Sequence, residues 1–167
     1  MGLLSILSSG IQAMIDDATT PQSFKMGEQF ENYVRECLFI DKYYDILERT
    51  HNYKTNQDYV QSSLKPDFKF RDRLTKKDFY VEAKFRTSDY KGKIVWCNDK
   101  QLSRYLDYNK ERPVFLILGM GGNPKSPEFL SLIPLMQAKY TGLFPSHAEK
   151  FEIQVDKFVP SKTLWAR

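Results

Sequence analysis

The sequence is poor in cysteine and histidine, with two of each among its 167 residues. Cys37 and Cys97 have no Cys or His partner at metal-ligand spacing, which argues against a zinc site or a disulfide framework. They are typical of reduced thiols in a cytoplasmic protein. His51 and His147 are equally isolated, and His51 reads as a surface or hydrogen-bonding residue.

Long hydrophobic runs, repeats and low-complexity linkers are also lacking. The apolar residues within 1–14 follow no Lys or Arg and are too few to span a bilayer, so no membrane segment is expected. Residues 1–20 are interpreted as an arm or short amphipathic helix that docks on the domain or on a partner chain; a signal peptide is the weaker alternative. The apolar arm would suit a homodimer.

Glycines are present at 119, 121 and 122, but no Lys-Ser/Thr pair and no helix start follow them. This excludes a phosphate-binding loop of the P-loop type. The length predicts one domain over 21–167, and hydrophobic residues at 41% with charged residues at 28% are ordinary for a globular chain.

Two stretches predict a hairpin of strands, 65–70 and 79–85, joined by a polar turn near Thr75. Alternation places Glu82 and Lys84 on one face of the second strand. The ladder sets Asp67 across from Glu82 or Lys84, on the same face as both. Two carboxylates converging there would repel unless a cation lies between them, and oxygen ligands suit Mg²⁺.

The basic residues are concentrated around this hairpin. Between 65 and 93 the chain carries ten Lys or Arg residues against five acids, whereas its whole net charge is +4. Such an excess is expected where phosphates are bound. The alternative is a solvated hairpin whose lysines protect a sheet edge.

A helix is predicted from about Pro21 to Ile40, capped by Thr20. Its apolar face includes Phe30 and Val34 and is bordered by Glu31, which needs a cation or an ion-pair partner. Gly27 in mid-helix suggests that another backbone or a ligand approaches closely there.

A second helix is predicted over about 100–110, capped by Asn98 or Asp99. Gln101 and Tyr105 share one of its faces. Gln101 could equally be the glutamine of a capping box opened by Asn98, and Tyr105 a core aromatic residue with a hydrated hydroxyl.

The remaining predicted elements are strands at 43–49, 94–97, 114–119, 128–135 and 151–155, a short helical piece at 136–140, and a loop at 51–63 that could cross the site. The order of helices and strands predicts an α/β domain with a mixed central sheet flanked by helices.

In this order the motifs resemble the PD-(D/E)XK nuclease superfamily, the restriction-endonuclease-like fold. The stretch 27–31 is similar to the Gly-x-x-x-Glu of Holliday junction resolvases, Pro66-Asp67 and Glu82-Ala83-Lys84 to the signature itself, and 101–105 to the Gln-x-x-x-Tyr of exonuclease-type members. The resemblance covers an αβββαβ core over 24–118 and leaves 119–167 as a C-terminal extension.

The resemblance implies a metal-dependent nuclease acting on DNA. Asp67 and Glu82 would bind Mg²⁺ or Mn²⁺ with the Ala83 carbonyl, Glu31 would hold a metal-bound water or a second ion, and Lys84 would orient or activate the attacking water. Gln101 and Tyr105 would help position nucleic acid, and Arg86, Lys91 and Lys93 are candidates for phosphate contacts.

Two alternatives stay open. One is a non-catalytic nucleic-acid-binding or assembly module on a nuclease fold, and the other is a structural domain in which Asp67, Glu82 and Lys84 form a cluster of salt bridges.

Overall fold

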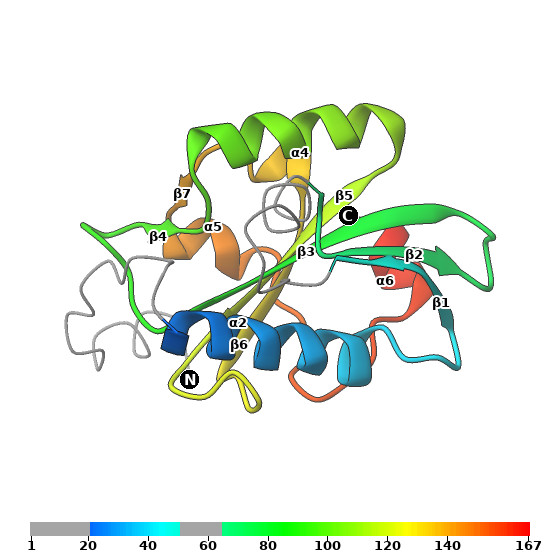
Figure 1. Ribbon diagram of the computed structural model, residues 1–167, viewed down its shortest axis with the longest axis horizontal. Helices are drawn as coiled ribbons and strands as arrows, with labels where there is room; N and C mark the ends of the chain where they lie inside the picture. Colours follow the sequence, from blue (N-terminus) through cyan, green and yellow to red (C-terminus); the bar gives the residue numbers. More distant parts are fainter. Residues whose placement is uncertain (1–20, 51–64) are drawn as a thin grey trace.

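The computed structural model describes residues 21–50 and 65–167. They form an α/β protein with a five-stranded mixed sheet and a few helices, as the sequence predicts (Figure 1). The strand order is β1-β2-β3-β5-β6, and β3 and β5 are the one parallel pair among these five strands. The strands are β1 (Tyr44–Arg49), β2 (Phe68–Asp72), β3 (Asp78–Arg86), β5 (Val114–Met120) and β6 (Phe129–Pro134).

Helices cover both faces of the sheet. One face packs against α2 (Pro21–Tyr33), which continues as the π-helical turn η1 (Val34–Leu38), and the other against α4 (Asp99–Glu111) (Figure 1). Both predicted helices are thereby confirmed, although the predicted cap at Thr20, the arm at 1–20 and the loop at 51–63 lie outside the described residues. No helix of the described part of the chain is long and apolar enough to cross a membrane.

The predicted hairpin is confirmed, and β2 pairs with β3 in the register Phe68↔Val81. Odd-numbered residues of β3, such as Val81, belong to the core beneath α2, whereas Tyr80 belongs to the core beneath α4. Glu82 lies two residues beyond Tyr80 and shares its face. Period-two alternation thus positions the charged pair on the α4 side of the sheet.

The chain after β6 differs from expectation. A small second sheet joins β4 (Ile94–Val95) to β7 (Gly142–Leu143), and three short helical pieces follow β6: η2 (Leu135–Gln137), α5 (Pro145–Glu149) and α6 (Ser161–Trp165). The η2 turn replaces the predicted helical piece at 136–140, and the last two helices were not predicted.

The predicted edge strand at 151–155 is wrong. This stretch contacts β6 through a single bridge, Ser131↔Glu152, and through backbone hydrogen bonds at Phe151 and Ile153. Asp156 then turns the chain at φ +57°, and its N–H donates to the Tyr33 hydroxyl of α2 at 2.8 Å. The chain is therefore paired with β6 by one bridge and then bonded to α2.

No described residue approaches Gly27 closely, since a Cβ there would meet nothing within 4 Å; a ligand at this position stays a prediction. The close approach occurs at Gly119 of β5, where a Cβ would lie 2.5 Å from the Phe30 ring. Glycine at 119 therefore lets Phe30 of α2 pack directly on the backbone of β5.

Candidate active site

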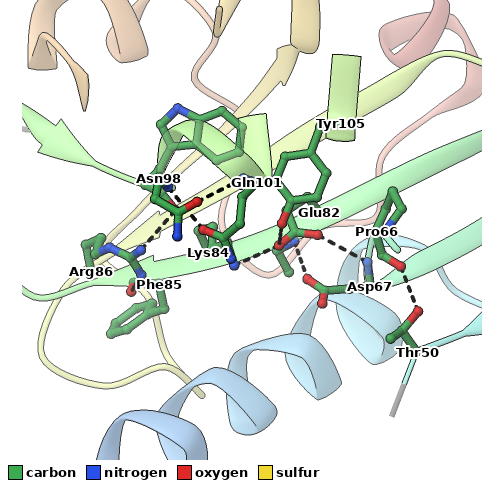
Figure 2. Close-up of polar contacts among 12 residues, drawn as sticks. Thr50, Pro66, Asp67, Glu82, Lys84, Phe85, Arg86, Asn98, Gln101 and Tyr105 are labelled. Carbon is green, nitrogen blue, oxygen red and sulfur yellow. Dashed lines mark hydrogen bonds and ion pairs between the residues drawn. The ribbon is translucent and has the colours of Figure 1, made fainter. Parts of the chain in front are cut away.

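Asp67 and Glu82 meet at the start of the β2–β3 pair. The register of the hairpin extends to place Asp67 opposite Glu82, one of the two partners that the sequence predicts. The Ala83 N–H donates to Asp67 Oδ2 at 2.8 Å, and the Asp67 N–H donates to Glu82 Oε2 at 3.2 Å (Figure 2). Each carboxylate is thus held by the backbone of the neighbouring strand.

Lys84 completes the predicted trio. Its Nζ lies 2.7 Å from Glu82 Oε1, and the Glu82 side chain is only 3% exposed (Figure 2). Burial acts to lower the pKa of Lys84, but the negative charges of Glu82 and Asp67 outweigh it and raise that pKa. The amine is therefore a protonated donor at neutral pH rather than a base.

Tyr105 reaches the same carboxylate from α4. Its hydroxyl donates to Glu82 Oε1 at 2.7 Å (Figure 2), and its ring stacks on Trp96 with centroids 5.8 Å apart. Burial, together with the charge of Glu82, raises the pKa of Tyr105, so the phenol stays neutral. The structure brings Tyr105 to the acid cluster as a buried support for Glu82.

Glu31 contributes a third acid from α2 and is buried, as its place beside the apolar stripe predicts. Burial, and then the charge of Glu82, raise the pKa of Glu31 to about 7, with Arg49 and Lys84 acting in the opposite sense. The pKa of Asp67 is also raised, by burial first and then by Glu82 and Glu31. These three acids therefore share one electrostatic environment.

The donor set of the acid cluster fits a divalent cation that keeps several of its water ligands. Within residues 21–50 and 65–167 no group of three His, Cys, Asp or Glu side chains is placed to hold an ion together. Mg²⁺ commonly binds through one or two carboxylates and keeps several waters, which needs no such group. Burial first, and then repulsion among the acids, raise the pKa values of Asp67 and Glu31, and a bound cation would oppose both effects.

Gln101 and Arg86 have partners of their own. The Gln101 side chain accepts the Asn98 N–H at 3.1 Å while Asn98 caps the Gln101 N–H at 2.9 Å, which confirms the capping box (Figure 2). The Arg86 guanidinium donates to the carbonyls of Phe85, Val95 and Trp96 at 2.7–3.0 Å. Burial lowers the pKa of Arg86. Contact of either side chain with nucleic acid stays a prediction.

Lys91 and Lys93 lie apart from the acid cluster, on the exposed turn that leads into β4. The Lys91 ammonium lies 5.3 Å from the centre of the Tyr90 ring, and that of Lys93 lies 5.0 Å from the centre of the Phe144 ring. Both side chains are exposed, so their ammonium groups are accessible to an anion, as a phosphate contact requires.

Two residues near the site were missed by the sequence-based reasoning. Arg49, at the end of β1, acts on Glu31 electrostatically and lies over the Phe68 ring. The signal in the sequence was a basic residue at the end of the predicted strand that precedes the hairpin. Trp96 supports Tyr105, and no local signal distinguishes it from any other buried aromatic residue.

Comparison of the chain with models of known protein families gives no match, and comparison with curated protein sequences finds none of significant similarity.

Proposed function

We propose that the protein is a divalent-metal-dependent nuclease of the PD-(D/E)XK type that hydrolyses phosphodiester bonds in DNA. The observation that carries the proposal is the convergence of Asp67, Glu82 and Lys84 across the β2–β3 pair. The element order supports it as well, because α2, β1, β2, β3, α4 and β5 occur in the order of the αβββαβ core of that superfamily, with the short turn η1 and the two-residue strand β4 inserted.

In this proposal Asp67 and Glu82 bind Mg²⁺ or Mn²⁺, helped by the Ala83 carbonyl and by Glu31. A bound divalent ion lowers the pKa of its water and offsets charge on the phosphate. The buried acids also hold that ion in a setting of low dielectric constant, where its interactions are stronger than in water.

The protein groups supply the remaining chemistry. Lys84, kept protonated by its acidic neighbours, donates to the attacking water or to a phosphoryl oxygen and stabilises the charge that develops there. Glu31, which reaches the acid cluster from α2, would hold a metal-bound water or a second ion. Tyr105 holds Glu82 in place for the ion.

The test is cleavage of plasmid, single-stranded and branched DNA with Mg²⁺ or Mn²⁺. Asp67→Ala and Lys84→Ala are expected to abolish cleavage, whereas Lys110→Ala, on the exposed side of α4, should leave it unchanged. Calorimetry of Mn²⁺ binding gives a readout independent of activity, and Asp67→Ala should weaken it. Cleavage that survives both substitutions at the site would overturn the proposal.

One observation favours a second candidate, a nucleic-acid-binding or assembly module without turnover. Glu82 already accepts from the Tyr105 hydroxyl, the Lys84 ammonium and the Asp67 N–H, so its carboxylate is satisfied without an ion. Such a module would bind DNA in a salt-sensitive way and cut none of the three substrates. It would also show no Mn²⁺ binding that depends on Asp67.

A further inference from the structure

The small β4–β7 sheet has one buried face and one exposed face. Ile94 and Leu143 pair with each other and are buried in the core beneath α4. Their neighbours Val95 and Gly142 also pair, and alternation turns them to the opposite side. On this outer side the Lys93 ammonium lies 5.0 Å from the centre of the Phe144 ring, and Tyr140 is an exposed residue two positions before Gly142.

Two exposed aromatic residues and one lysine belong to the outer face, which is defined here as Lys93, Val95, Tyr140, Gly142 and Phe144. Tyr140 is 72% exposed and Phe144 58% exposed, whereas most aromatic side chains of the described residues are buried in the two cores. A Cβ at Gly142 would lie 3.3 Å from Lys93 Cβ. Because Gly142 has no side chain, the middle of the outer face is flat there, and the aliphatic part of Lys93 lies beside it.

The charge around this face is positive. Across 89–95 and 139–144 the chain carries three lysines (Lys91, Lys93 and Lys139) and one acid, Asp89. Exposed rings next to exposed lysines are the combination with which proteins bind single-stranded nucleic acid, since bases stack on the rings and phosphates contact the ammonium groups. An apolar protein partner would not account for the lysines.

The outer face is tied to the acid cluster through buried contacts. Arg86 lies two residues beyond Lys84 on β3, about 7 Å along the strand, and its guanidinium donates to the carbonyls of Val95 and Trp96. The Trp96 indole N–H donates to the Tyr140 carbonyl at 2.7 Å, and the Trp96 ring stacks on Tyr105, which bonds to Glu82. These buried contacts hold the β4–β7 sheet in place beside the acid cluster.

From this arrangement we infer that the outer face of the β4–β7 sheet binds unpaired bases of a single-stranded nucleic acid, with Tyr140 and Phe144 as stacking rings and Lys93 as a phosphate contact. The inference rests on the proposed function, because the bound strand is taken to be part of the substrate that is cleaved at Asp67 and Glu82. It narrows the substrate class to nucleic acid with an unpaired segment next to the scissile bond.

The experiment measures binding of fluorescein-labelled oligothymidylate and of a labelled blunt duplex to the full chain in EDTA. All variants are made in the Asp67→Ala background, so cleavage cannot intervene. The double substitution Tyr140→Ala/Phe144→Ala is expected to weaken oligothymidylate binding about tenfold or more, because each stacked base contributes substantially to affinity. Duplex binding should change less than about twofold, since its bases are not available for stacking.

Two further variants make the result specific. Leu74→Ala removes another exposed apolar side chain, 80% exposed on the β2–β3 turn, and should leave both affinities unchanged. Lys93→Gln should weaken binding and reduce the slope of log affinity against log salt by about 0.7, the value for one phosphate contact on a single strand.

Unchanged oligothymidylate affinity in the aromatic double variant would overturn the inference, as would an equal loss on the duplex. So would a loss of self-association without a loss of oligonucleotide binding, because the face would then be a contact between two copies of the chain. A cleavage assay of the protein with Asp67 intact separates the inference from the proposed function. Cleavage that does not depend on Tyr140 and Phe144 refutes this inference alone. Binding that depends on Tyr140 and Phe144 without any cleavage refutes the proposed nuclease activity alone.

Discussion

The hydrogen bond between Tyr105 and Glu82 gives the sharpest test of how the acid cluster is built. The substitution Tyr105→Phe removes one oxygen atom, the donor that lies 2.7 Å from Glu82 Oε1 in a buried environment. The ring and its stacking on Trp96 are kept. Any change therefore reports on the hydroxyl rather than on core packing.

The expected cost follows from the charge of the acceptor. A hydrogen bond to a charged group contributes about 1.5–3 kcal/mol to stability, against about 1 kcal/mol for a neutral pair. Glu82 keeps its contacts with Lys84 and with the Asp67 N–H, so we expect a loss of about 2 kcal/mol in the free energy of unfolding. In a chain of this length that corresponds to a Tm lower by about 4–8 °C.

The assay is urea unfolding of four proteins: wild type, Tyr105→Phe, Glu82→Gln and the double variant. With glutamine as a neutral acceptor the hydroxyl should be worth only about 1 kcal/mol, which leaves a coupling of about 1 kcal/mol, above the usual additivity error of 0.3–0.5 kcal/mol. Tyr108→Phe, on the same helix, is the matched control and should cost less. Equal costs for Tyr105→Phe with glutamate and with glutamine would refute the reasoning.

Three further predictions concern stability. In EDTA, Glu31 binds a proton more tightly in the folded state, with a pKa of about 7 against 4.5, so wild-type stability should fall as pH rises between those values. Glu31→Gln should remove the Glu31 part of that fall, about 3 kcal/mol at pH 8 and little at pH 4, and leave the part that comes from the raised pKa of Asp67; melts that give the same difference at both pH values would contradict it. Asp72 accepts hydrogen bonds from the side chains of Ser161, Trp165 and Thr75, which hold its pKa low despite burial. Asp72→Asn should therefore lower the free energy of unfolding by about 2–4 kcal/mol above pH 5 and release α6 from the sheet. The release is measured by the fluorescence of Trp165, and an unaltered emission would contradict the prediction. Gly119→Ala should cost about 1–3 kcal/mol in chemical unfolding, because its Cβ would overlap the Phe30 ring, and Gly122→Ala, where a Cβ meets nothing within 4 Å, is its control.

Local patterns in the sequence determined the parts of the site that depend on neighbouring residues. Alternation along 79–85 placed Glu82 and Lys84 on one face of β3, and a turn of the expected length set Asp67 opposite Glu82. The capping box of Asn98 and Gln101 depends on a spacing of three within one helix turn, and it too was predictable. In each case the atoms that interact are close in the chain or joined by one short turn.

Only the tertiary structure decided which distant groups complete the cluster. Tyr105 of α4 bonds to Glu82 of β3 and stacks on Trp96, and the Arg86 guanidinium donates to the Val95 carbonyl of β4. Beyond its one bridge to β6, the chain after 150 bonds through Asp156 to Tyr33, 123 residues away in sequence. Such contacts depend on packing between segments far apart in the chain, and no local period or spacing encodes them.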